Sequence, residues 1–192
     1  MKILLIILCL LLNSCLKRDF EELASIPTVE DEQIYSILDR KALGYHFNYQ
    51  KGPNSIPIKV PKTVNMLLLD DKYRTVDYYY FLKFNKWFKS LKFHNGIMAI
   101  NQNETLDCDN FAMLYKALFS VSAYASGNSQ EFAVASVVVH QINEFGGIPK
   151  GGLHMVNLIF TRGAWYIFEP QTGEYIEIQK YPNQEYIITI IL

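Results

Sequence analysis

The sequence is poor in cysteine, in net charge and in long apolar runs. Only three cysteines occur among its 192 residues, Cys9, Cys15 and Cys108, which excludes a disulfide-rich scaffold. Its 18 basic and 19 acidic residues give a formal net charge of −1, and this near balance excludes electrostatic capture of nucleic acid as a partner. The longest apolar run, residues 3–12, is shorter than the roughly 20 residues that span a bilayer.

The N-terminus has the pattern of a secretory signal. Lys2 precedes the apolar run 3–12, whose length suits the core of a removable signal peptide. The run ends in Leu12-Asn13-Ser14-Cys15, which resembles the lipobox of bacterial lipoproteins and implies that Cys15 becomes a lipidated N-terminus. The alternatives are ordinary cleavage nearby and an uncleaved anchor. We therefore expect a signal peptide over 1–14, a lipidated tether over 15–28 and a single domain over 29–192.

The cysteine count makes Cys108 the residue of interest. If Cys9 leaves with the signal peptide and Cys15 carries lipid, Cys108 has no partner for a disulfide. A lone thiol in an exported protein is usually buried or reactive. Because Asp107 and Asp109 flank the thiol, simple burial is disfavoured.

Hydrophobic periodicity divides the chain into helices followed by strands. We expect helices over 29–43, 73–91 and 107–125, and then strands over 132–142, 153–160, 165–168, 175–178 and 186–192. This order predicts an α+β fold in which the helices pack on an antiparallel sheet. The helix over 73–91 places its aromatic residues on one face and Lys83, Lys86 and Lys89 on the other, either as a solvated face or as a contact for anionic lipid.

Three residues could form a nucleophilic triad. Cys108 lies in the first turn of its predicted helix, where the helix dipole stabilises a thiolate. His154 and Glu169 lie on or beside two strands joined by a tight turn at Arg162-Gly163. That turn pairs residues whose numbers sum to about 325, which brings Glu169 within cross-strand reach of His154. The three could serve as nucleophile, base and orienting acid.

At these residues the chain resembles the transglutaminase-like cysteine hydrolases, specifically the bacterial transglutaminase-like cysteine proteinases. The motifs that carry the resemblance are Asp107-Cys108-Asp109-Asn110-Phe111-Ala112, His154-Met155-Val156 and Phe168-Glu169. The resemblance implies a papain-like or transglutaminase-like core, with Cys108 as nucleophile, His154 as general base and acid, and Glu169 as the residue that orients His154. Glu169 departs from the pattern, because the family's acid is commonly aspartate.

Two further roles follow from the resemblance. Gln102, six residues before the thiol, is the oxyanion-hole candidate, although Asn101 and Asn103 are chemically equivalent. Asp107 and Asp109 are candidate calcium ligands, because some family members bind calcium beside the cysteine; no cofactor is required for the thiol chemistry itself. Two carboxylates are far fewer than the six to eight oxygens that calcium takes, and Asp107 alternatively caps the helix.

These observations predict an exported, lipid-anchored cysteine hydrolase of the bacterial cell envelope, facing the periplasm or the exterior. Its partners would be the membrane, through Cys15, and an envelope protein or peptide whose amide bond it cleaves through an acyl-enzyme at Cys108. One alternative is a catalytically silent surface-binding lipoprotein on the same fold. The other is a transglutaminase that transfers the acyl group to an amine.

Overall fold

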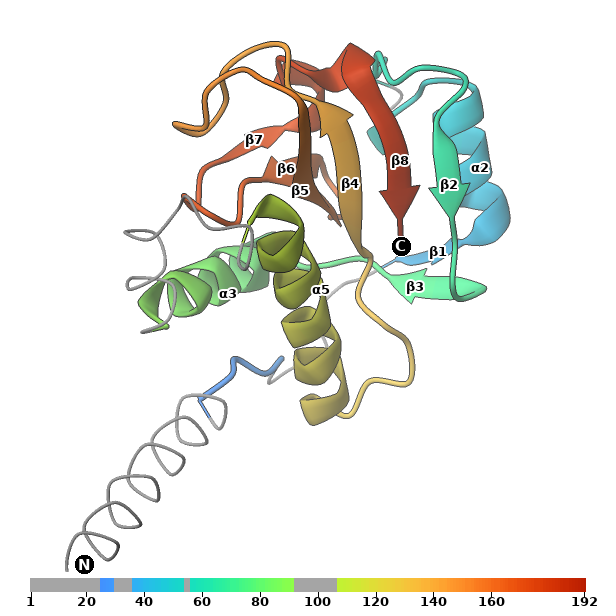
Figure 1. The fold of residues 1–192 in the computed structure, drawn as a ribbon. Helices are drawn as coiled ribbons and strands as arrows, with labels where there is room; N and C mark the ends of the chain where they lie inside the picture. Colours follow the sequence, from blue (N-terminus) through green and yellow to red (C-terminus); the bar gives the residue numbers. More distant parts are fainter. Residues whose placement is uncertain (1–24, 30–35, 54–55, 92–106) are drawn as a thin grey trace, which may run out of the picture.

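A computed structural model describes residues 25–29, 36–53, 56–91 and 107–192 (Figure 1). The predicted signal peptide, Cys15 and the start of the tether lie outside the described residues. No helix among the described ranges is long and apolar enough to cross a membrane.

Most of the described regular elements are strands. In chain order they are β1 (Ile37–Asp39), α2 (Arg40–Asn48), β2 (Asn65–Leu67), β3 (Lys72–Arg74), α3 (Tyr78–Ser90), α5 (Cys108–Ala125), β4 (Val134–His140), β5 (Leu153–Phe160), β6 (Trp165–Phe168), β7 (Tyr175–Glu177) and β8 (Ile187–Ile191), with two short 3₁₀ helices, Ile178–Lys180 and Gln184–Tyr186, before β8.

A six-stranded sheet organises the molecule. Its strand order is β2-β8-β4-β5-β6-β7, while β1 and β3 form a separate antiparallel pair. From β4 to β7 the chain meanders with antiparallel neighbours. Strand β8 returns to the other side of β4, and β2 pairs with β8 in parallel. The sheet is therefore mixed, and its parallel pair joins segments far apart in the sequence.

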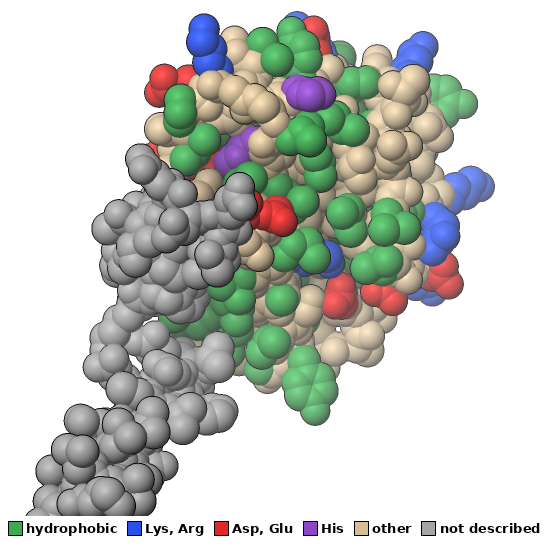
Figure 2. All heavy atoms as spheres, viewed as in Figure 1, with side chains coloured by type: hydrophobic (Ala, Val, Ile, Leu, Met, Phe, Trp, Pro, Cys, Tyr) green, Lys and Arg blue, Asp and Glu red, His purple; other side chains and the backbone are tan. Residues whose placement is uncertain are grey.

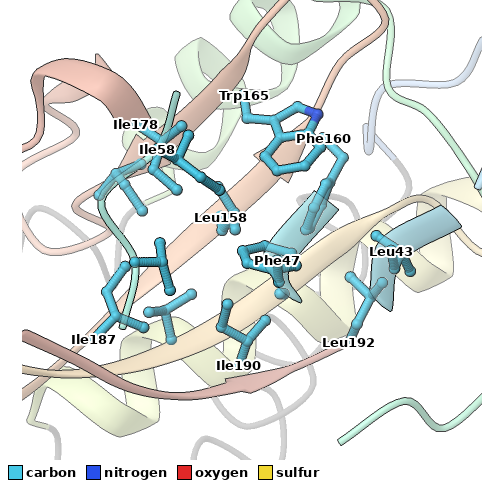
Figure 3. Packing of buried hydrophobic residues seen from close by; sticks show 14 of the residues in the cluster. Leu43, Phe47, Ile58, Leu158, Phe160, Trp165, Ile178, Ile187, Ile190 and Leu192 are labelled. Carbon is cyan, nitrogen blue, oxygen red and sulfur yellow. The ribbon is translucent and has the colours of Figure 1, made fainter. Parts of the chain in front are cut away.

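The sheet carries an apolar cluster on each face. On one face Leu43 and Phe47 of α2 pack with Trp165 and the C-terminal strand residues Ile190 and Leu192 (Figure 3). On the other face aromatic side chains of α3 and α5, including Phe84 and Phe119, gather with Phe168 of β6. Because successive strand residues point to opposite faces, β5 contributes Leu158 to the first cluster and Ile159 to the second.

The predicted fold class was wrong. The papain-like or transglutaminase-like α+β core has the cysteine-bearing helix packed on an antiparallel sheet, but most of the described elements are strands, and the main sheet is mixed. Within the helix predicted over 29–43, residues 37–39 form strand β1, and α2 begins only at residue 40. There the Asp39 carboxylate caps the Ala42 amide at 2.7 Å, and the helix continues through Gly44. Residues 73 and 74, predicted as helix, belong to β3.

The face shown in Figure 2 has no large area of one charge among its described residues. Figure 2 shows acidic and basic side chains in small groups among polar and apolar ones over the face in view. This agrees with the near-neutral net charge of −1.

Trp165 closes the first cluster. It is 2% exposed, and its ring lies 5.5 Å from that of Phe47 and 4.8 Å from that of Phe160. We expect Trp165→Ala to lower the free energy of unfolding by about 3–5 kcal/mol, because it leaves a cavity between α2 and the sheet. Urea denaturation measures the change. The control is Tyr124→Ala on α5, where the side chain is 85% exposed and a change within about 0.5 kcal/mol is expected; equal losses in both variants would contradict this account.

Candidate functional site

Three elements bring together the side chains that the sequence motifs single out. Cys108 is the first residue of α5, His154 is the second residue of β5, and Glu169 directly follows β6. The predicted hairpin register is confirmed, since Asn157 pairs with Phe168 and Phe160 pairs with Trp165. This register brings Glu169 diagonally beside His154.

The imidazole and the carboxylate form a buried pair. His154 Nε2 lies 2.6 Å from Glu169 Oε2, and the side chains are 6% and 0% exposed. The second carboxylate oxygen, Oε1, accepts the backbone N–H of Gln171 at 3.0 Å. Both oxygens of Glu169 therefore have donors, which removes the cost of burying an unpaired carboxylate.

Cys108 also interacts with the imidazole. Cys108 is half-buried and hydrogen-bonds with the His154 side chain. Because Glu169 holds Nε2, Nδ1 is the ring nitrogen left for the thiol. Burial lowers the pKa of His154, but the hydrogen bonds with Cys108 and Glu169 and their charges outweigh it and raise the pKa to about 9. The protonated imidazole is thus stabilised between two acidic partners.

The start of α5 is held by a capping box. The Asp107 side chain accepts the backbone N–H of Asn110, and the Asn110 side chain accepts the Asp107 backbone N–H at 3.5 Å. The sequence reading of Asp107 as the N-cap is confirmed. The pKa of Asp107 is raised by a hydrogen bond with Asp109, by desolvation and by the Asp109 charge. The two carboxylates therefore lie close together.

The predicted calcium site at Asp107 and Asp109 stays a prediction. In the described part of the chain no group of three or more His, Cys, Asp or Glu side chains is placed to hold a metal. Asp107 and Asp109 share a hydrogen bond, whereas calcium takes six to eight oxygens that all face the ion. We therefore derive no chemistry from a metal here.

Helix α5 is positioned by two buried polar side chains that belong to none of the sequence motifs. Asn157 donates through Nδ2 to the carbonyls of Ala112, at 2.9 Å, and Ala135, at 3.2 Å. Ser136 on β4 donates through Oγ to the same Ala112 carbonyl at 3.5 Å. A sequence signal was available, because Asn157 is the one amide in the run Leu153-His154-Met155-Val156-Asn157-Leu158.

Gly146 packs closely against the side chain of Glu169. Gly146 has φ +61°, and a Cβ at this position would lie 3.2 Å from Glu169 Cβ and Cγ. The loop 145–148 therefore closes over Glu169 because residue 146 has no side chain. The oxyanion candidate Gln102, and Asn101 and Asn103 with it, lie outside the described residues, as does the lipidation candidate Cys15.

The chemistry available to this arrangement is proton transfer from thiol to imidazole. It would give a thiolate at the positive end of a helix, beside an imidazolium held by Glu169. The hollows described below are lined by none of Cys108, His154 and Glu169.

Among known proteins, only solved structures match this chain, and they match it in fold. No family model and no curated protein matches the sequence. A solved structure titled "PSL1a-E64 complex" is similar with a TM-score of 0.55 at 15% identity, over 81% of this chain and 50% of that chain. A Polyporus squamosus lectin bound to a human-type influenza-binding epitope is similar with a TM-score of 0.54 at 15% identity, over 81% of this chain and 49% of the lectin. The chain thus spans about half the length of the structures it matches.

These comparisons correct two predictions. The fold is shared with lectin structures, which contradicts the papain-like or transglutaminase-like fold class. The same finding contradicts the predicted function, a cysteine hydrolase acting on an envelope amide, and with it the cysteine-protease class. The order of Cys108, His154 and Glu169 in the sequence identified side chains that lie together in the fold. It gave no information about a substrate. The resemblance to the transglutaminase-like family stays a prediction.

The buried pair predicts how stability varies with pH. The pKa of His154 in the folded protein, about 9, is above its usual value of 6.5. The stabilisation is therefore fully present below about pH 6.5 and is lost as the pH rises through about 9. In Glu169→Gln the pKa of His154 should fall and this loss should shrink. Titration of the His154 ring by NMR, with urea unfolding at about pH 6 and about pH 9.5, measures both effects.

The matched control is Glu174→Gln, an exposed acid in the turn that follows Glu169. It should leave the His154 titration unchanged. A His154 midpoint near 6.5 in the wild-type protein, or the same midpoint in wild type and Glu169→Gln, would contradict the pairing.

Proposed function

We propose that this protein binds a carbohydrate, and that it does so in a groove formed by two adjoining hollows remote from Cys108. The first hollow is lined by residues that include Gln179, Lys180 and Tyr186, and the second by residues that include Tyr49 and Gln50. Lys59 and Glu185 line both hollows. Their side chains form an ion pair at 3.6 Å on the ridge between the two.

The observation that carries this proposal is an exposed tyrosine in each hollow. Tyr49 is 67% exposed and Tyr186 is 41% exposed. The C–H groups on one face of a sugar ring pack on an aromatic face, and the phenol hydroxyl can bond a sugar hydroxyl at the same time. Volumes of about 340 and 460 Å³ place each hollow in the range of small-ligand sites.

The floor of the groove is fixed before a ligand arrives. Gln184 accepts the Lys59 backbone N–H and donates to the Ile178 carbonyl at 2.6 Å. Asn143 and Asn183 bond reciprocally, at 2.7 Å and 2.9 Å. Preorganised walls reduce the entropy lost on binding, while Lys180, Glu185 and Gln179 offer polar groups at the rim. The fold shared with half of a glycan-bound lectin adds support.

A glycan panel followed by calorimetry tests the proposal. We expect wild-type protein to bind at least one oligosaccharide, and Tyr49→Ala and Tyr186→Ala each to weaken its affinity about tenfold, because each removes one stacking platform worth about 1.4 kcal/mol. The control is Tyr124→Ala, which removes a still more exposed tyrosine, 85% accessible, from α5 and should leave affinity unchanged. Absence of binding across the panel, or equal affinity in all three variants, would refute the groove.

A second candidate function rests on the bond between His154 and Glu169. In acyl transfer, the Cys108 thiolate attacks an amide carbonyl, and His154 gives its proton to the leaving amine. A second amine then attacks the thioester and loses a proton to His154, and the sulfur leaves as the thiolate, which restores the thiolate–imidazolium pair. The buried carboxylate at 2.6 Å holds the imidazole in the orientation that both proton transfers need.

Alkylation of Cys108 by iodoacetamide near pH 6 tests this second candidate, with peptide mapping to separate Cys108 from the other cysteines. We expect His154→Ala to slow labelling at least tenfold, because the thiolate loses its imidazolium partner. The control is His140→Ala on strand β4, an exposed histidine, which should label at the wild-type rate. Slow and equal labelling of all three proteins would show that the thiol is not activated.

A further inference from the structure

We infer that the hollow between residues 25–28 and helix α3 binds the phosphate groups of an anionic bilayer, and that it sets this side of the protein against a membrane. The hollow has a volume of about 430 Å³. Its lining residues are Ser25, Ile26, Pro27, Thr28, Lys83, Lys86, Trp87 and Ser90. It shares none of them with the proposed glycan groove.

Two lysines supply the charge. Lys83 and Lys86 are exposed and three residues apart on α3, so they lie on the same side of the helix, over one hollow. With a net charge of −1 the whole molecule has no general attraction for anions. The attraction is therefore local, and two neighbouring ammonium groups favour a surface with many phosphates, to which each lysine contributes about a fivefold gain in affinity.

Trp87 distinguishes a bilayer from a soluble phosphate. It lies beside the lysines, half-buried, and its Nε1 donates to Ser25 Oγ at 3.0 Å. An indole with a bonded N–H and an exposed apolar edge is suited to the boundary between headgroups and acyl chains, where tryptophan is enriched in membrane proteins. A small phosphorylated ligand would use the lysines and have no need of this edge.

The path of the chain points to the same surface. Residues 25–28 line the hollow, and Ile26 and Pro27 are buried there. Cys15, the predicted lipidation site, precedes Ser25 by ten residues, which span at most about 36 Å. If Cys15 carries lipid, this side of α3 is held within reach of the headgroups.

Fluorescence of the full chain mixed with vesicles tests the inference. Trp87 should shift to shorter wavelength with vesicles that contain phosphatidylserine and should be quenched by brominated acyl chains. Vesicles of phosphatidylcholine alone, and inorganic phosphate, should have no such effect. Trp165 is 2% exposed and provides a constant background, and Trp87→Phe should abolish the signal. The double variant Lys83→Gln/Lys86→Gln should require about thirty times more anionic lipid, and Lys86→Gln alone about fivefold.

The matched control is Lys41→Gln/Lys72→Gln, which removes two exposed lysines from α2 and β3, away from α3 (Figure 1). It should titrate like wild type. The same shift with neutral vesicles, an equal loss in both double variants, or no response of Trp87 to anionic vesicles would overturn the inference. A shift caused by inorganic phosphate would overturn it in favour of a soluble ligand. None of these results depends on glycan binding, so the two proposals succeed or fail separately.

Discussion

The placement of helix α5 on the sheet depends on one buried amide. Asn157 on β5 donates to the Ala112 carbonyl, in the second turn of α5, and also to the Ala135 carbonyl on β4. A single side chain thereby joins a helix and two strands in a region where Asn157 is fully buried. Apolar contacts alone would allow the helix to slide along the sheet, whereas a directional bond in a medium of low dielectric fixes its register.

That register determines what meets at the end of the helix. Cys108 lies four residues before Ala112, and His154 lies three residues before Asn157. Once the amide has joined helix and strand, the thiol and the imidazole come within hydrogen-bond reach, and the hairpin register adds Glu169. The aromatic cluster that α3 and α5 share, in which the Phe84 and Phe119 rings lie 3.8 Å apart, fills the space around this anchor.

Local signals allowed much of the second half of the chain to be predicted. The strands 153–160 and 165–168 follow from alternation and from the Arg162-Gly163 turn, and they have the expected bounds. Helix α5 begins at its acidic cap and ends before Gly127, which has φ +71°. The pairing of Glu169 with His154 follows from register arithmetic alone, because a hairpin is a local structure.

The structure of the first half of the chain and the fold class could not be predicted from local signals. Strand β2 pairs with β8 across more than a hundred residues, and no local pattern marks a parallel partner. Gly44 was expected to end a helix and instead lies inside α2, where Leu43 and Phe47 contribute to the core. Packing against Trp165 outweighs the weak local preference of a glycine. The lectin likeness, at 15% identity, leaves no motif in the sequence.

The backbone carbonyl of Pro27 connects the chain to two helices. Its carbonyl accepts the Tyr80 hydroxyl at 2.7 Å and the Ser122 hydroxyl at 2.5 Å, so the chain is bound to α3 and α5 together before it reaches the sheet. A pulling force applied through the residues before Ser25 is therefore divided between two helices packed side by side. The sheet, with the proposed glycan groove and the buried histidine, follows that junction along the chain.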